Sequence, residues 1–250
     1  MHSKRLIAFD MDGTLTESGC SMDHEMGELL SALLGSGRMV AIISGGSFES
    51  LNRQVLARWD YPRKFLKNFF LFPLCGATFW RWGKNSWDLV YKEALLKEEK
   101  DKIVRALFAS FSDAGCVRPQ NIYGEEIIDL DTQITFTALG REAPLELKRN
   151  WDPSGDKRFK IKSALAPRLS GFDIRLGGTT SLDITRSGID KAFGIKQIEK
   201  LLGIPKSDII FLGDSFYGGG NDSPVKLAGV ACLEMTGPES TKAAVRELLR

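Results

Sequence analysis

The 250-residue sequence is poor in histidine and cysteine, and both shortages narrow the chemistry open to it. Its two histidines, His2 and His24, lie near the N-terminus and neither is placed for a Ser-His-Asp hydrolase, which we therefore do not expect. The four cysteines lie far apart and form no C-x-x-C pair. We expect no zinc site and interpret the thiols as reduced and structural.

The sequence also lacks any apolar run close to the roughly 20 residues that span a bilayer. Few apolar residues precede Asp10, too few for the core of a signal peptide. The net charge is only +2, so composition gives no sign of nucleic-acid or anionic-membrane binding. We therefore expect a cytoplasmic protein with neither partner.

Short apolar runs alternate with helical patterns at both ends of the sequence. A helix capped by Ser21 and stopped by Gly35 is expected after the first run. This alternation predicts an α/β fold, a parallel sheet with helices on both faces. The expected strands are 6–9, 39–43, 69–72, 208–212 and 230–233, and the later helices are 48–59, 191–202 and 240–249.

The middle of the sequence has a different pattern. Residues 97–114 form an amphipathic helical pattern, and 127–131 and 134–137 alternate apolar and polar residues as half-buried antiparallel strands do. A charged helical stretch at 157–165 precedes two further expected strands, 172–176 and 181–184. We predict an inserted α+β domain at 83–188, with the core divided into 1–82 and 189–250.

Polar residues stand where the predicted core strands end or a helix begins. They are Asp10 and Asp12, Ser44, Lys191 and Asp214. In open α/β sheets, sites form outside the carboxyl ends of the strands. A carboxylate that attacks a phosphate dianion meets a repulsion of about 4 kcal/mol per charge pair at close range. We expect Asp10 and Asp214 to hold Mg²⁺, Lys191 to add positive charge, and Ser44 with the Gly45 N–H to hold phosphate oxygens.

The spacing of Asp10 and Asp12 indicates how the reaction would run. Asp10 is the expected nucleophile, forming an aspartyl phosphate, and Asp12 the expected acid and base for the leaving and incoming oxygens. Gly13 would permit a tight turn, which a hydrogen bond from Thr14 would steady. Each element alone has an ordinary explanation as a surface acid, a loop or a turn, but the ordered combination favours phosphoryl transfer.

Four segments resemble the motifs of the haloacid dehalogenase (HAD) superfamily: F-D-M-D-G-T at 9–14, I-S-G-G at 43–46, Lys191, and G-D-S-F-Y-G-G-G-N-D at 213–222. The insert resembles the C2b cap of the type IIB members. The resemblance implies a Rossmann-like core with a parallel sheet, plus an inserted α+β cap. It also implies Mg²⁺ held by Asp10, the Asp12 carbonyl and Asp214, with Asn221 and Asp222 completing the metal loop.

Within the superfamily, the sequence is most similar to eukaryotic-type α-phosphomannomutases. G-G-S-F-E at 45–49, L-G-R at 139–141 and G-G-T-T-S-L-D at 177–183 resemble motifs of that family. The resemblance implies a phosphorylated sugar as substrate and a possible homodimer through the cap. Arg141 and Ser181 would hold its distal phosphate and Asp183 its hydroxyls. An ordinary alternative for Arg141 is a surface pair with Glu142 or Glu146.

The sequence departs from that family at several basic positions. Gly19 and Leu130 stand where the family has arginines, and Lys148 replaces a third with a group that lacks the bidentate fork. Cys75-Gly76 replaces part of an E-N-G segment. A mutase must hold both ends of a bisphosphate, so we favour a sugar-phosphate phosphatase. The second hypothesis is a phosphohexomutase that interconverts hexose 1- and 6-phosphates.

Three further hypotheses are less favoured. A D-x-D glycosyltransferase would need a nucleotide-binding unit upstream of residue 10, and no room exists for one. A receiver-like phosphorylation switch would carry its acceptor on a later strand of a shorter chain. A HAD domain that only binds is disfavoured because all the core motif groups are present.

Overall fold

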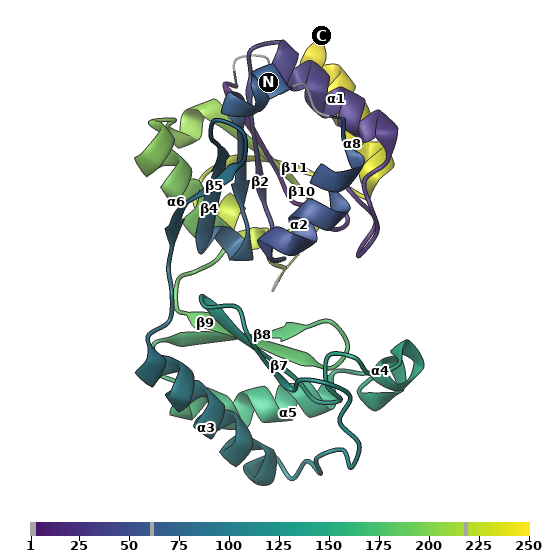
Figure 1. Ribbon diagram of the computed structural model, residues 1–250, viewed down its shortest axis with the longest axis vertical. Helices are drawn as coiled ribbons and strands as arrows, with labels where there is room; N and C mark the ends of the chain where they lie inside the picture. Colours follow the sequence, from purple (N-terminus) through teal and green to yellow (C-terminus); the bar gives the residue numbers. More distant parts are fainter. Residues whose placement is uncertain (1–3, 61–62, 218–219) are drawn as a thin grey trace. The chain divides into compact units, whose positions relative to one another are not determined.

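The apolar runs at both ends of the sequence form one large sheet in the computed structural model, which describes residues 4–60, 63–217 and 220–250 (Figure 1). The strand order is β11-β10-β1-β2-β3-β4-β5, parallel from β11 to β3 and antiparallel at β4 and β5. Every residue of β1 is buried, as expected for a strand covered on both faces. The strands are β1 Leu6–Phe9, β2 Met39–Ile43, β3 Phe69–Phe72, β4 Thr78–Trp82, β5 Trp87–Lys92, β10 Ile209–Gly213 and β11 Ala231–Glu234.

Helices cover both faces of this sheet. One apolar cluster joins it to α1 and α8, which lie side by side, and a second joins it to α6 (Figure 1). The expected α/β fold is thereby confirmed. The α-helices are α1 His24–Gly35, α2 Phe48–Gln54, α6 Lys191–Leu202, α7 Ser223–Leu227 and α8 Pro238–Leu249; short 3₁₀ turns are η1 Leu56–Arg58, η2 Arg63–Asn68, η3 Leu74–Gly76 and η5 Lys206–Asp208.

The middle of the chain forms a second, antiparallel sheet of order β6-β7-β9-β8. Its apolar face packs against α3 and α5 around a separate cluster that includes Phe136, Ile161 and Leu182. The chain thus forms two compact units, Met1–Lys92 with Ile189–Arg250, and Glu93–Gly188. The elements of the smaller unit are α3 Lys97–Asp113, β6 Ile127–Asp129, β7 Gln133–Thr137, α4 Leu145–Trp151, α5 Asp156–Leu165, η4 Ala166–Arg168, β8 Phe172–Gly177 and β9 Ser181–Arg186.

Strand β5 lies inside the range 83–188 expected to form the insert, but it pairs with β4 in the larger sheet. Tryptophans explain this placement. The ring centroid of Trp80 lies 4.0 Å from that of Phe48 in a stacked arrangement, and Trp87 meets Phe69 edge-on at 5.7 Å. The hairpin therefore joins the core of the larger unit through its aromatic side chains.

Two helix ends differ from expectation. Asp23, rather than Ser21, caps α1, because its carboxylate accepts a hydrogen bond of 2.9 Å from the Met26 N–H. The helix expected at 48–59 ends at Gln54 and continues only as the 3₁₀ turn η1. Helix α4 was not expected; it buries none of its residues, so it carries no apolar stripe to reveal it.

Membrane spans and disulfides are absent from the described part of the chain. None of its helices combines the length and apolar character needed to cross a bilayer. All four cysteines are free thiols, with Cys20 exposed and Cys75 buried.

Candidate active site

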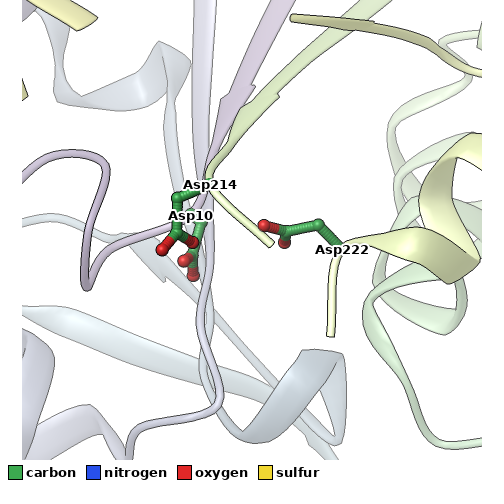
Figure 2. Close-up of side chains that lie close together, drawn as sticks. All are labelled: Asp10, Asp214 and Asp222. Carbon is green, nitrogen blue, oxygen red and sulfur yellow. The ribbon is translucent and has the colours of Figure 1, made fainter. Parts of the chain in front are cut away.

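Three aspartates from separate segments meet at the carboxyl edge of the larger sheet. Asp10 follows β1, Asp214 follows β10, and Asp222 precedes α7. One carboxylate oxygen of each lies within 4.8 Å of the others. Figure 2 shows the carboxylates of Asp10 and Asp214 side by side, with that of Asp222 pointing toward them. The topology expected from the strand ends therefore brings these residues together.

A single buried ammonium group joins two of the three aspartates. Lys191 is fully buried at the first position of α6, and its Nζ lies 2.6 Å from both Asp10 Oδ1 and Asp222 Oδ1. It also donates a hydrogen bond of 3.1 Å to Asn221 Oδ1. Asp190 caps the helix by accepting from the Phe193 N–H at 3.0 Å, which fixes where α6 begins.

Burial and charge oppose each other in this cluster. Burial raises the pKa of Asp10 to about 6, although Lys191 pulls it downward. Burial alone would lower the pKa of Lys191, but the carboxylates of Asp10 and Asp222 outweigh it and hold that pKa above its ordinary value. The lysine therefore stays charged, whereas the Asp10 carboxyl has a pKa of about 6, not far below neutral pH.

Two glycines leave the room that the aspartates occupy. Gly13 has φ +77°, and a Cβ there would lie 2.3 Å from Asp214 Oδ2. A Cβ at Gly213 would lie 2.4 Å from Asp222 Oδ2. The turn at Gly13 thus serves two purposes, because it adopts a left-handed conformation and lets the Asp214 carboxylate approach the backbone.

Asp12 lies in the loop after Asp10 and is oriented by the backbone. Gly19 donates its N–H to Asp12 Oδ1 at 2.8 Å. Thr14 bonds back to the loop through its backbone N–H, which donates to the Met11 carbonyl at 3.3 Å, whereas its hydroxyl is buried without a partner among the described residues. The Thr16 hydroxyl donates to the Met11 carbonyl at 3.4 Å.

Ser44 follows β2 and is buried within a hydrogen-bonded loop. Its Oγ accepts from the Gly46 N–H at 3.0 Å, and its carbonyl accepts from the Cys75 N–H at 2.8 Å. Gly45 is exposed and has no atom within 4 Å of where its Cβ would be. The arrangement leaves a serine hydroxyl and glycine backbone near the same sheet edge.

The turn that supports this loop was not anticipated. Leu74 and Cys75 both have positive φ, 52° and 58°, which is uncommon for such residues. Leu74 donates its N–H to the Gly46 carbonyl at 2.9 Å, so both ends of the Ser44 loop are held from this turn. No sequence signal marks it, since glycine and asparagine are the usual residues in that conformation.

Ser215 is a second unanticipated contact. Its N–H donates to Asp222 Oδ2 at 2.9 Å and its hydroxyl to Asp214 Oδ1 at 3.1 Å. It follows Asp214 directly in the G-D-S segment, and that adjacency is the signal that could have indicated it. Gly218 and Gly219 of the same segment lie outside the described residues.

The donor set fits a hard divalent cation. Three carboxylates face one ammonium group here, which leaves a surplus of negative charge in a buried place. Oxygen ligands are those that Mg²⁺ prefers. Both carboxylate oxygens of Asp222 are bonded, Oδ1 by Lys191 and Oδ2 by Ser215. Lys191 bonds Asp10, and Ser215 bonds Asp214, through Oδ1 alone, so these two are the better placed to hold the cation.

The expected cap residues lie together at one end of the smaller sheet. Ser181 begins β9 and pairs with Thr137 at the end of β7, from which the chain turns to Arg141. Lys148 donates to the Arg141 carbonyl at 2.8 Å. The Arg141 guanidinium is exposed and makes no ion pair with Glu142 or Glu146 within residues 93–188, all of which are described.

Comparison with known proteins places this geometry in a family. Residues 7–224 match the haloacid dehalogenase-like hydrolases. The chain is 28% identical to a phosphomannomutase of Schizosaccharomyces pombe over 98% of its length and 94% of that protein. It is 26% identical to the phosphomannomutase of Saccharomyces cerevisiae over 87% of its length and 83% of that protein.

Solved structures share the fold. A C-terminally truncated IMP-nucleotidase of Plasmodium falciparum matches with a TM-score of 0.71 at 19% identity, over 99% of this chain and 72% of that one. A haloacid dehalogenase-like hydrolase of Bacteroides thetaiotaomicron matches with a TM-score of 0.65 at 18% identity, over 98% and 99%. The matched span and the aspartate cluster agree, and the chain belongs to the family of haloacid dehalogenase-like hydrolases.

Proposed function

We propose that this enzyme transfers a phosphoryl group to and from Asp10 with Mg²⁺ as cofactor and a hexose phosphate as substrate, and that its net reaction is the phosphomannomutase type. The contact that carries the proposal is the 2.6 Å pair of Asp10 Oδ1 and Lys191 Nζ inside the aspartate cluster. That pair gives a buried carboxylate beside a fixed positive charge, which a covalent phosphoryl acceptor requires.

The first half-reaction follows from the positions of Asp10 and Asp12. A carboxylate oxygen of Asp10 bonds to phosphorus as the bond from phosphorus to the sugar oxygen breaks, and Asp12 gives that oxygen its proton. Lys191 keeps Asp10 oriented and offsets its charge. When bound, Mg²⁺ would be held by Asp10, the Asp12 carbonyl and Asp214, with Asn221 and Asp222 behind them, and would neutralise charge on the phosphate.

The second half-reaction reverses the first on a different hydroxyl. Asp12 takes the proton of the incoming hydroxyl, whose oxygen bonds to phosphorus while the bond to Asp10 breaks. Gly19 holds Asp12 Oδ1 at 2.8 Å through the backbone, which supports a fixed position for this acid and base. Ser44 and the Gly45 N–H would hold the phosphate oxygens.

The smaller unit supplies the proposed sugar contacts. Arg141, Lys148 and Ser181 would bind the distal phosphate, and Asp183 the ring hydroxyls. The exposed Arg141 guanidinium has donors to spare, and arginine forks onto phosphate in a bidentate way. The resemblance also suggests a homodimer through this unit, which sedimentation velocity would test.

The relatives favour a sugar as the final phosphoryl acceptor, whereas some of the residues favour water. Phosphomannomutases match nearly the full length of the chain, which favours the mutase over the phosphatase preferred from sequence. Against it, Leu130 brings no charge, and Gly19 has φ +74° and serves the turn that holds Asp12. Hydrolysis therefore stands as the second candidate, supported by that shortage of guanidinium groups.

One incubation distinguishes the two outcomes. The enzyme is mixed with mannose 1-phosphate, Mg²⁺ and a trace of hexose 1,6-bisphosphate, and both products are followed by phosphorus NMR. Mannose 6-phosphate as the main product is the expected result, and inorganic phosphate as the main product would replace the mutase by the phosphatase. Phosphoryl transfer that persists in Asp10→Asn would refute the covalent route altogether.

A further inference from the structure

On β7, β9 and β8, one face of the smaller sheet carries only polar residues and glycine, and Ile128 of β6 extends that face beside Thr135. Residues directly opposite each other in an antiparallel pair share a face, so the pairing of β7, β9 and β8 sets nine positions side by side. None of the nine is apolar, whereas most alternate residues of the same strands belong to the apolar cluster shared with α3 and α5, namely Ile134, Phe136, Phe172, Ile174, Leu182 and Ile184. The nine are Gln133, Thr135 and Thr137 of β7, Thr185, Asp183 and Ser181 of β9, and Asp173, Arg175 and Gly177 of β8.

The middle row of this face crosses three strands. Thr135 pairs with Asp183, and Asp183 pairs with Arg175. Gln133 donates to the Thr135 hydroxyl at 2.9 Å, and that hydroxyl donates to Asp183 Oδ1 at 2.7 Å. One oxygen of Asp183 is therefore fixed by the protein, in a definite direction along the row.

The second oxygen of Asp183 lies over a glycine. A Cβ at Gly177 would stand 2.6 Å from Asp183 Oδ2, so the absent side chain is what lets the carboxylate lie there. Burial raises the pKa of Asp183, while the Thr135 hydrogen bond and the Arg175 charge lower it. Arg175 is the one cationic residue among the nine positions, all of which are described.

Asp173 and Thr185 are the polar neighbours of this pair on the same face. Asp173 Oδ2 lies 3.6 Å from Arg175 Nη2, and Asp173 itself accepts from the Ser187 hydroxyl at 2.9 Å. Thr185 is buried, and its hydroxyl has no partner among the described residues. Two carboxylates thus flank one guanidinium, which is a poor setting for a second phosphate but a good one for hydroxyl groups.

We infer that Arg175 is a further substrate-positioning residue, acting with Asp183 Oδ2 as an adjacent donor and acceptor that binds neighbouring hydroxyls of the sugar ring. A hydroxyl can donate to the carboxylate and accept from the guanidinium, so the pair recognises a polyol by direction as well as charge. This inference rests on the proposed function, and it adds a residue that the sequence motifs did not indicate.

Arg168 provides a matched control. It lies in the same unit with a side-chain exposure of 40%, against 35% for Arg175, and it also pairs with an aspartate, Asp113. It belongs to η4 rather than to the polar face. Arg175→Met, Arg175→Lys and Arg168→Met are titrated calorimetrically, without Mg²⁺, with mannose 1-phosphate and with inorganic phosphate.

The expected result is specific to the sugar. Arg175→Met should weaken mannose 1-phosphate binding about tenfold, since a hydrogen bond to a charged group contributes about 1.5 kcal/mol. Inorganic phosphate binding should be unchanged, Arg168→Met should change neither, and Arg175→Lys should restore part of the loss. A cooperative thermal unfolding transition shows that a variant is folded. If Arg175→Met is not folded, the affinity of Arg175→Lys for mannose 1-phosphate tests the inference.

Several results would overturn the inference. The first is equal affinity for mannose 1-phosphate in Arg175→Met and Arg168→Met, and the second is a loss of inorganic phosphate binding in Arg175→Met as large as the loss of sugar phosphate binding. The third is a wild type that does not bind mannose 1-phosphate. The fourth applies if Arg175→Met does not fold, and it is full affinity for mannose 1-phosphate in Arg175→Lys. These binding measurements contain no Mg²⁺ and involve no phosphoryl transfer. Failure of the proposed function would look different: the sugar phosphate would bind but would not be converted when Mg²⁺ is present.

Discussion

The aspartate cluster of the larger unit and the Arg141 segment of the smaller unit hold their polar residues in opposite ways. In the larger unit, Asp10, Lys191 and Asp222 are almost fully buried, and Lys191 Nζ lies 2.6 Å from an oxygen of each aspartate. In the smaller unit, Arg141 is exposed and Lys148 touches it only through its carbonyl. Groups that are buried and coupled depend on one another, so losing one should disable the set. Exposed groups act separately, and losing one should produce a graded change.

The largest effect should come from removing the buried ammonium group. Lys191→Met leaves Asp10 and Asp222 facing each other without a counter-charge. We expect a loss of roughly a thousandfold in kcat and of about 3 to 5 kcal/mol in the free energy of unfolding. Steady-state kinetics and urea unfolding measure the two.

Lys242→Met is the control for that variant. Lys242 is also buried and pairs with Asp23 and Glu239 at 2.6 Å, but it links α8 to the start of α1, away from the cluster. Its loss should lower stability and leave kcat of the folded protein near that of the wild type. Equal losses of kcat in both variants would show that Lys191 acts through stability alone.

A pH-dependent effect should follow from the burial of Asp10. Because the pKa is raised to about 6, the Mg²⁺-free folded protein binds this proton more tightly than the unfolded chain does. The contribution of Asp10 to the free energy of unfolding should therefore fall as pH rises from about 4 to about 6, by at most about 3 kcal/mol, and stay level above that.

Urea unfolding of wild type and Asp10→Asn across this range measures the contribution. The difference between the two isolates the contribution of Asp10 within its cluster, since the groups away from the cluster titrate alike in both. Added Mg²⁺ should stabilise the wild type above pH 6 and affect the variant much less. A difference that does not change with pH would contradict the raised pKa.

The sequence indicated where the polar residues of the larger unit meet, for a physical reason. Asp10, Ser44 and Asp214 each follow a continuous apolar run, and parallel strands bring such ends to one edge of the sheet. The β4–β5 hairpin was missed because the apolar pattern of β5 does not follow its burial; Leu89 and Val90 are adjacent apolar residues and both are exposed. Asp23 and Ser21 are equally good caps by residue type, and only the contact to Met26 distinguishes them.

Pairing across strands was beyond prediction. Arg175 and Asp183 are neighbours only because β8 and β9 pair in one register, and a shift of one residue would place them on opposite faces. Gly13 and Asp214 are likewise about 200 positions apart in the sequence, and they meet because Gly13 adopts a left-handed conformation. Glycine permits that conformation but does not require it. Local patterns carry neither kind of information.

A smaller effect should separate close approach from backbone strain. Gly13→Ala and Gly37→Ala both place a side chain at positive φ, +77° and +85°, but only the first meets another residue, Asp214. Both should lose about 1 to 2 kcal/mol of stability. Gly13→Ala alone should also weaken Mg²⁺ binding about tenfold to a hundredfold, as measured by calorimetry. Equal Mg²⁺ affinity in the two variants would show that Asp214 does not depend on the space Gly13 leaves.

The smallest effect should come from the exposed arginine of the smaller unit. Arg141→Met removes a guanidinium with no protein partner in the fully described range 93–188, so stability should stay within about 0.5 kcal/mol of the wild type. If Arg141 binds the distal phosphate, kcat/KM for mannose 1,6-bisphosphate should fall about tenfold, because one charge-assisted contact contributes about 1.5 kcal/mol. Transfer from p-nitrophenyl phosphate, which has no distal phosphate, should be unaffected.

Arg149→Met removes another exposed arginine, on α4, and should alter neither rate. Equal losses on the two substrates would mean that Arg141 supports the reaction in general, and the contrast between a coupled core and an independent cap would then not hold.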